Sequence, residues 1–214
     1  MEVVKFSMSP RPYQLGQRKA ASDQTRARIL TAARTLLMAP DGYSRFSIET
    51  VARQADVARM TVYHQFGSKA GLLEGLCDSL AASGGMEQLA GAFQQPEPLA
   101  ALNRYIEIFG HFWEVDRLVM RRLRALATLD PDFEQVIRTR DEWRRRGVRT
   151  LLQRMVEQRL LSFDEASKTF EEIVDVLFTL TSFETFDALA GPTKSLEEVA
   201  PVVQRLVGAA IGLA

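Results

Sequence analysis

Apolar side chains recur at intervals of three and four residues along almost the whole of this 214-residue chain. Ile29, Leu30, Ala33, Leu36 and Leu37 show the pattern first, and they share one face of a helix because an α-helix repeats every 3.6 residues. No run of strand length alternates apolar and polar residues between turns. The sequence therefore predicts an all-α protein of about nine helices.

Turn residues and capping signals divide this pattern into separate helices. Residues 40–42 (PDG) end the first helix, because proline lacks a backbone donor and glycine tolerates left-handed backbone. Segments 162–165 and 195–198 fit the capping box, in which a hydroxyl and a carboxylate bind free backbone amides. Helices are expected from residue 22 to the turn at 40–42, after residue 47, and over 59–66, 68–82, 98–115, 117–129, 131–160, 165–190 and 195–212.

Pattern and charge divide the chain into three parts, residues 1–21, 22–82 and 83–214. The first carries basic residues without hydrophobic periodicity, which favours a flexible basic arm. Residues 1–82 hold 11 basic and 7 acidic groups, net +4, whereas residues 83–214 hold 16 and 20, net −4. This small asymmetry favours an anionic partner for the N-terminal part.

Composition narrows the class of protein. With 46% hydrophobic and 25% charged residues, the chain has an ordinary globular composition. No segment approaches about 18 consecutive apolar residues, so we expect no membrane span and no membrane partner. The first residues lack the apolar run of a signal peptide, and the single cysteine, Cys77, fits the reducing cytoplasm.

Catalytic and metal-binding patterns are missing from the sequence. His64, His111 and Cys77 are too few to build a Cys/His zinc cluster. The chain contains neither a phosphate-binding P-loop nor a nucleophile elbow. The paired carboxylates Glu171 and Glu172 are adjacent, so they point in different helical directions. We therefore expect no enzyme activity, no cofactor and no metal.

Residues 47–66 have the spacing of two short helices joined by a turn. Small Ala52 and Ala55 allow the helices to cross closely, and Asp56 occupies the turn, where a short polar side chain tolerates left-handed backbone. This is helix-turn-helix spacing, in which the second helix enters the major groove of DNA. The same spacing occurs in helical proteins that bind no DNA, so a protein-interaction module is the alternative.

Under the DNA-binding interpretation, the second helix presents polar side chains to bases and phosphates, and two further residues lie at helix starts whose free amides suit phosphate oxygens. The first group is Arg59, Thr61, Tyr63 and His64, and the second is Ser47 and Lys69. In the alternative interpretation Tyr63 is a core residue and His64 is merely solvated.

Three segments of the N-terminal part resemble the TetR family of bacterial transcriptional regulators. Residues 25–33 (TRARILTAA) are similar to the first helix of that family, and residues 47–52 (SIETVA) to its second. Residues 61–72 (TVYHQFGSKAGL) are similar to its recognition helix and the start of its fourth helix. The detailed resemblance covers about a quarter of the chain, and the later helices agree only in number and length.

Three positions depart from the family pattern. Asp56 and Met60 stand where glycine is common, and Ala58 stands where a serine often caps the recognition helix. Loss of such a cap costs about 0.5–2 kcal/mol of helix stability. These departures leave open where the recognition helix starts and whether Asp56 or a neighbour replaces the cap.

The resemblance implies a homodimer that binds a palindromic DNA operator and represses transcription until a small-molecule effector enters the C-terminal domain. Carried over by position, the residues that face DNA are Arg59, Met60, Thr61, Tyr63 and His64, with Lys69 on a phosphate. Val62 and Phe66 are assigned to the core of the domain. A dimer also agrees with the physics of recognition, since one short helix reads too few base pairs for operator-grade specificity.

Aromatic residues of the C-terminal part are candidates for the effector site. A cavity with aromatic walls and few polar groups is typical of small-molecule sites. We therefore expect an apolar or aromatic effector, although aromatic residues at helical spacing also fit an ordinary core. The candidate residues are Phe109, Phe112, Trp113, Trp143, Phe178 and Thr181.

The last two expected helices, 165–190 and 195–212, supply the expected dimer surface. Val199, Val203 and Leu206 recur there beside small residues that allow close approach of helices, while an internal core helix is the alternative. Residues 138–154 hold seven arginines in seventeen residues. Interleaved acidic residues favour a solvated face for that segment over a surface for an anionic partner.

Overall fold

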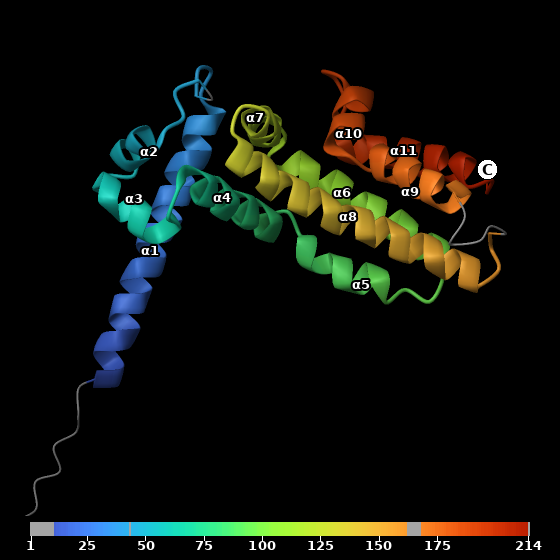
Figure 1. Ribbon diagram of the computed structural model, residues 1–214, viewed down its shortest axis with the longest axis horizontal. Coiled ribbons are helices and arrows are strands. Elements are labelled where there is room, and N and C mark those ends of the chain that lie inside the picture. Colours follow the sequence, from blue (N-terminus) through green and yellow to red (C-terminus); the bar gives the residue numbers. More distant parts are fainter. Residues whose placement is uncertain (1–10, 43, 162–167, 214) are drawn as a thin grey trace, which may run out of the picture. The chain divides into compact units, whose positions relative to one another are not determined.

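The computed structural model describes residues 11–42, 44–161 and 168–213, and every regular element among them is helical (Figure 1). The predicted all-α class is confirmed. The helices are α1 (Arg11–Met38), α2 (Ile48–Gln54), α3 (Arg59–Phe66), α4 (Lys69–Ser83), the 3-10 helix η1 (Met86–Gln88), α5 (Leu89–Phe93), α6 (Pro98–Val115), α7 (Arg117–Ala127), α8 (Pro131–Glu157), α9 (Lys168–Leu180), α10 (Phe183–Ala190) and α11 (Leu196–Ala210).

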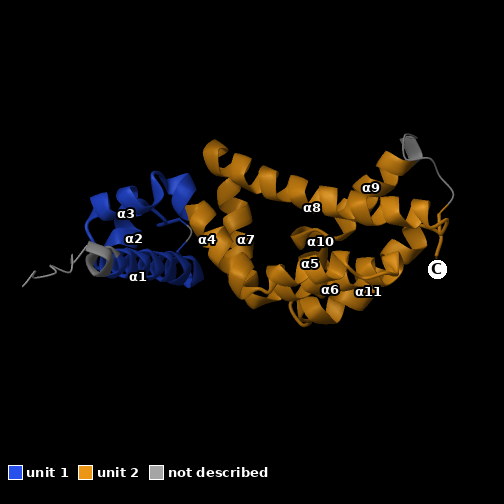
Figure 2. Cartoon of the chain, turned by 90° about the horizontal axis from the view of Figure 1, so that it is seen from below, with its two compact units in different colours: residues 1–72 blue, residues 73–214 orange. Residues whose placement is uncertain are grey.

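The chain divides into two compact units, residues 1–72 and residues 73–214 (Figure 2). The division falls inside α4, so this helix begins in the first unit and continues in the second. The boundary expected from the sequence, between residues 82 and 83, lies at the other end of the same helix.

The first unit is built from α1, α2, α3 and the start of α4. Helix α1 packs against α2, and α2 packs against α3. The interface is apolar, with Ile29, Ala33, Val51 and Val62 fully buried. Burial of these side chains is what holds two helices of seven and eight residues in place, since helices that short are unstable alone.

Helix α1 begins at Arg11, well before the start predicted at residue 22. Every side chain described between residues 16 and 24 is exposed, so this stretch has no apolar stripe by which the sequence could reveal it. It is rich in alanine, glutamine, lysine and arginine, which extend a helix once its later turns are packed. The basic arm expected over residues 1–21 is therefore helical from Arg11, and residues 1–10 lie outside the described residues.

The second unit is a bundle centred on α6 and α8, which run alongside each other in Figure 1. Helix α6 also packs against α5 and α11, and α8 packs against α7 and α9. The core of the bundle contains Leu102, Ile106, Leu151 and Phe186, all fully buried. No helix within the described residues combines the length and apolar character needed to cross a membrane.

The single helix expected over residues 165–190 is two helices, α9 and α10, separated at Thr181 and Ser182. The Thr181 hydroxyl donates to the Leu177 carbonyl, 2.9 Å away, and the Ser182 hydroxyl accepts from the Thr185 amide at 3.2 Å. Ser182 thereby caps a new helix, because its hydroxyl competes with the backbone for a helical amide. The short η1–α5 segment was also not predicted.

One of the two predicted capping boxes is confirmed. The Glu198 amide donates to the Ser195 hydroxyl at 3.1 Å, and the Ser195 amide donates to the Glu198 carboxylate at 2.7 Å. The box predicted at residues 162–165 lies outside the described residues.

Candidate nucleic-acid interface and ligand cavity

The turn between α2 and α3 has the conformation that the sequence predicts. Ser47 caps α2, its hydroxyl accepting from the Thr50 amide at 3.1 Å. Asp56 adopts left-handed backbone with φ of +51° and so reverses the chain after α2. Val62 on α3 is fully buried, which fixes the side of α3 that remains exposed.

The exposed side of α3 carries the residues predicted to contact DNA. Arg59 and His64 are exposed, Met60 is 59% exposed, and Thr61 and Tyr63 are half-buried. The Arg59 guanidinium donates to the Tyr63 hydroxyl at 3.1 Å, and this hydrogen bond raises the pKa of Arg59. The helix therefore presents a cation, an aromatic hydroxyl and an imidazole, all groups that bind base edges or phosphates.

Helix α3 starts at Arg59 without a side-chain cap among the described residues. Ala58 has the extended backbone of an N-cap residue, with φ of −66° and ψ of 145°, but it has no oxygen to offer. The Asp56 side chain does not replace the missing cap in the described structure. Gly67 ends the helix with φ of +75°, a conformation that favours glycine.

Arg26 and Ser22 of α1, which sequence reasoning did not select, both bind Gln65 near the end of α3. The Arg26 guanidinium donates to the Gln65 carbonyl at 2.8 Å and lies 4.2 Å from the centre of the Phe66 ring. The Gln65 amide donates to the Ser22 hydroxyl at 2.9 Å. Arg26 belongs to the TRARIL segment, but no spacing rule in the sequence gives its partner 39 residues away.

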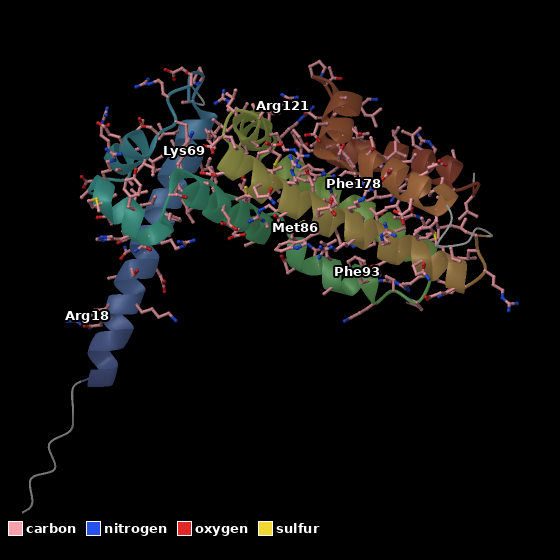
Figure 3. All side chains as sticks on the ribbon, in the orientation of Figure 1. Arg18, Lys69, Met86, Phe93, Arg121 and Phe178 are labelled. Atoms are coloured by element: carbon pink, nitrogen blue, oxygen red, sulfur yellow. The ribbon has the colours of Figure 1, made fainter. Side chains whose placement is uncertain are left out.

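Lys69 is the first residue of α4 and lies on its N-terminal turn (Figure 3). The same first turn is capped by Ser68, whose hydroxyl accepts from the Gly71 amide at 3.0 Å. Ser47 and Lys69 thus both sit at helix starts, as the sequence predicts. The positive end of a helix dipole and a lysine at the same place suit a phosphate oxygen.

The second unit contains a cavity of about 360 Å³ lined by α4, η1, α5, α6, α7 and α8. Six of its eighteen lining residues are aromatic: among them, Tyr105 and Phe109 lie 4.7 Å apart between ring centres, and Phe112 and Trp113 lie 4.5 Å apart. Met86 and Phe93, which also line the cavity, lie on the η1–α5 segment (Figure 3). Both the volume and the wall are typical of a small-molecule site.

Four of the six effector-site candidates line this cavity, namely Phe109, Phe112, Trp113 and Trp143. Trp143 is 62% exposed, so the cavity reaches the surface at this side chain. Phe178 and Thr181 are not among the lining residues.

Phe178 and Thr181 instead hold Arg144 from the opposite side. The Arg144 guanidinium lies 4.0 Å from the centre of the Phe178 ring, and it donates to the Thr181 hydroxyl at 3.0 Å. Arg144 does line the cavity and is only 5% exposed. The sequence pattern missed it because a buried arginine occupies a position of the helical stripe where an apolar residue is expected.

Charged residues form one end of the cavity wall. The Arg140 guanidinium binds the Asp78 carboxylate at 2.6 Å, and the Arg124 guanidinium binds the Asp141 carboxylate at 2.8 Å. Burial lowers the pKa of Arg144, with only partial compensation from Asp141 at 3.5 Å. Burial opposes the charge of Arg124 too, but hydrogen bonds and charge from Glu184 and Asp141 outweigh it and raise its pKa.

The solvated face expected for residues 138–154 is found only in part. Arg144 is buried, Arg145 and Arg149 form ion pairs with Asp175 and Glu171 of α9, and Arg154 donates to the Phe93 carbonyl at 2.9 Å. The arginines join α8 to neighbouring helices because a long side chain can bury its stem and still reach a distant acceptor.

Metal chemistry finds no support in the part of the chain that the structure describes, where no group of three His, Cys, Asp or Glu side chains could hold an ion. The thiol of Cys77 lines the cavity, and burial raises its pKa to about 11. That thiol is therefore neutral at physiological pH and is a poor nucleophile or metal ligand.

Comparison with known proteins matches the N-terminal part of the chain to one family. Residues 29–76 match the family of bacterial regulatory proteins called the tetR family. Over 119 residues the chain is 33% identical to the HTH-type transcriptional regulator AlkX of Mycobacterium tuberculosis, a match that covers 52% of each protein. The chain thus spans about half the length of this curated relative.

Solved structures share the fold over most of the chain. The TetR family transcriptional regulator PfmR from Thermus thermophilus is 24% identical with a TM-score of 0.56, covering 84% of this chain and 96% of that one. A TetR transcription regulator from Haloarcula marismortui is 16% identical with a TM-score of 0.67, covering 89% and 97%. The helix-turn-helix geometry and the family match agree for the N-terminal part of the chain: residues 29–76 match the tetR family of bacterial regulatory proteins, and most of the chain shares the fold of solved TetR regulators.

Proposed function

We propose that this protein is a ligand-responsive transcriptional repressor, a homodimer that binds a palindromic operator through α3 and leaves it when a small molecule enters the cavity. The observation that carries the proposal is the exposed side of α3. Arg59, Tyr63 and His64 face outward there from a helix anchored by the fully buried Val62. The buried core therefore holds α3 in place, and its exposed polar side chains are available to contact DNA.

Direct recognition of DNA follows from the size and chemistry of this face. An α-helix fits the major groove, where arginine can donate two hydrogen bonds to guanine and smaller polar side chains reach other base edges. Lys69 and the capped start of α2 at Ser47 supply the phosphate contacts that position a helix on the duplex.

Dimerisation follows from the short length of α3. A helix of eight residues contacts few base pairs, so operator-grade specificity needs two copies set about 34 Å apart along the duplex. Exposed apolar side chains on three adjoining helices support a subunit interface there: Val176 on α9, Leu189 on α10 and Leu206 on α11. Apolar residues that are exposed in a single chain are the type of residue that a subunit interface buries.

Release by a ligand follows from the course of α4. This helix carries Lys69 at its first turn and contributes Cys77, Asp78 and Ala81 to the cavity wall. A ligand in the cavity thus contacts the helix that supplies a phosphate contact. Movement of α4, or a change in its order, would alter the spacing of the two recognition helices.

The proposal is tested by fluorescence anisotropy with a labelled duplex from the region upstream of the protein's own gene. We expect Tyr63→Ala and Lys69→Ala each to weaken binding about tenfold, with helicity and dimer mass unchanged. Lys69→Ala should also reduce the slope of log affinity against log salt by about 1, because one phosphate contact is lost.

Arg146→Ala is the matched control, since it removes one charge from an exposed position of the second unit. It should leave DNA affinity unchanged. Unchanged binding in both Tyr63→Ala and Lys69→Ala would refute the assigned interface. Failure to retard any duplex at low salt would favour a helical protein-interaction module, because nucleic-acid binding strengthens steeply as salt falls.

A further inference from the structure

The cavity wall contains buried hydrogen-bond donors that have no acceptor. Among the described residues, Nε1 of Trp113, Nε of Arg140 and Nε of Arg144 are buried and unpartnered. All three residues line the cavity. Trp113 is 6% exposed and Arg144 is 5% exposed, whereas the Arg140 side chain is 25% exposed although its Nε atom is buried.

Unpartnered donors of this kind are rare because they are costly. Roughly nine in ten or more of the buried polar groups in folded proteins have a hydrogen-bond partner. A donor left without one loses its hydration and gains nothing in return. Three such donors, all in residues that line one cavity, favour an acceptor group supplied by a ligand of that cavity.

The chemistry of the three groups restricts what can bind. An indole N–H and a guanidinium N–H donate and cannot accept, so a ligand must supply the acceptor. The carboxylates in the wall, Asp78 and Asp141, already accept from Arg140 and Arg124 at 2.6 and 2.8 Å. An ammonium group would therefore be repelled by the arginines of the wall, and the two carboxylates that could bind it are already paired with Arg140 and Arg124.

We infer that the effector is an amphipathic acid or close analogue, with an apolar body against the aromatic wall and an acceptor oxygen, most simply of a carboxylate, bound by Trp113, Arg140 and Arg144. This inference rests on the proposed effector role of the cavity and adds its ligand class. Phe109 and Phe112 supply the apolar surface. Hydrogen bonds from a cationic donor to a carboxylate are about twice as strong as neutral ones, and exclusion of water strengthens them further.

The test uses three probes built on one apolar body: 4-tert-butylbenzoate, tert-butylbenzene and 4-tert-butylbenzylammonium. The two tryptophans of the chain both line the cavity, so their indole N–H signals in a ¹H–¹⁵N spectrum report directly on it. Trp143→Phe assigns the Trp113 signal. We expect the benzoate to shift the Trp113 signal downfield and to bind at least about tenfold more tightly than the hydrocarbon.

Trp113→Phe removes the buried N–H while keeping an aromatic ring. We expect it to weaken benzoate binding about tenfold in calorimetry and to leave hydrocarbon binding within a factor of about two. Trp143→Phe is the matched control, because it removes an exposed indole at the mouth of the cavity and should leave the preference for the carboxylate unchanged. Arg140→Lys, which keeps the charge but removes Nε, should reduce that preference without abolishing it.

Three results would overturn the inference: equal affinity for hydrocarbon and carboxylate, tighter binding of the ammonium, or no benzoate binding at millimolar concentration. Duplex binding measured on the same preparation separates this failure from failure of the proposed function. A protein that binds DNA but shows no carboxylate preference keeps its regulatory role and loses the assigned ligand class. A protein that binds the carboxylate but no duplex loses the regulatory role.

Discussion

The two units of the chain place their candidate functional residues in opposite environments. In the first unit Arg59, Met60 and His64 lie on the exposed side of α3, and none of them contributes to the buried core. In the second unit Trp113 and Arg144 are almost fully buried and lie in the wall of a cavity. A surface site and an internal site therefore share one chain.

This difference has a consequence for stability. Substitutions on the exposed side of α3 should alter recognition with little effect on folding, because surface changes away from caps and cores are nearly neutral. Substitutions in the cavity wall should alter both ligand binding and folding stability, since the arginines that line the cavity also join helices.

Arg124→Met should produce the largest loss of stability, about 3 kcal/mol in the free energy of unfolding. The Arg124 side chain is 16% exposed and holds both Asp141 and Glu184; without it Glu184 loses this cation and Asp141 keeps only Arg144 at 3.5 Å. Urea denaturation followed by tryptophan fluorescence measures the loss in the second unit, where both tryptophans lie.

Arg121→Met is the control for that measurement. Arg121 lies on the same helix and also binds a carboxylate, but its side chain is 47% exposed and its partner Asp187 keeps Arg117 at 2.6 Å. The expected loss is below about 1 kcal/mol. Equal losses in the two variants would show that burial of the ion pairs does not govern the stability of this unit.

Ala58→Ser should stabilise α3 by about 1 kcal/mol, because the backbone at Ala58 already has the N-cap conformation and lacks only the accepting oxygen. Hydrogen exchange of the α3 amides measures the effect. Ser47→Ala is the reciprocal variant, and it should destabilise α2 by a similar amount through loss of the bond to the Thr50 amide. Unchanged protection of α3 in Ala58→Ser would mean that a different group already satisfies its first amides.

Acid should weaken the second unit through Asp187, with an effect below about 1 kcal/mol. Burial raises the pKa of Asp187, but hydrogen bonds and charge from Arg121 and Arg117 outweigh it and lower the pKa below its usual value. A carboxyl with a lowered folded-state pKa stabilises the fold above its unfolded pKa of about 4 and loses that contribution as the pH falls through the lowered value. Asp187→Asn should thus be less stable than the wild type at pH 7 and equal to it near pH 2, measured by thermal unfolding. If Asp187→Asn is still less stable than the wild type at pH 2, the loss of stability comes from packing and not from the charge of Asp187.

The surface site could be predicted from sequence far better than the internal one. The residues of α3 and the left-handed turn at Asp56 follow from short-range spacing, and the structure has them as predicted. Four of six cavity candidates line the cavity: three are aromatic residues of α6, and the fourth, Trp143, is on α8. Phe178 and Thr181 do not line this cavity, and the break between α9 and α10 beside them depends on hydroxyl hydrogen bonds, which have no strong periodic signal.

Arg144 was missed for a different reason. It lies four residues before the buried Val148, on the same stripe as Leu151 and Met155, so its position is that of a core residue. The residue type alone indicates a solvated side chain at this position, because long charged side chains are seldom buried. A charged residue in phase with an apolar stripe is the signal that would have identified it.

Selection of binding sites from a library of random DNA duplexes measures whether α3 recognises DNA as one of a symmetric pair. If α3 reads the major groove in a two-fold symmetric pair, the recovered sequences should contain an inverted repeat whose half-sites lie one helical turn of about 10 base pairs, or a multiple of it, apart. The Tyr63→Ala variant carried through the same selection should lose that repeat. Recovery of no common sequence, or of a single unpaired half-site, by the wild-type protein would contradict the account.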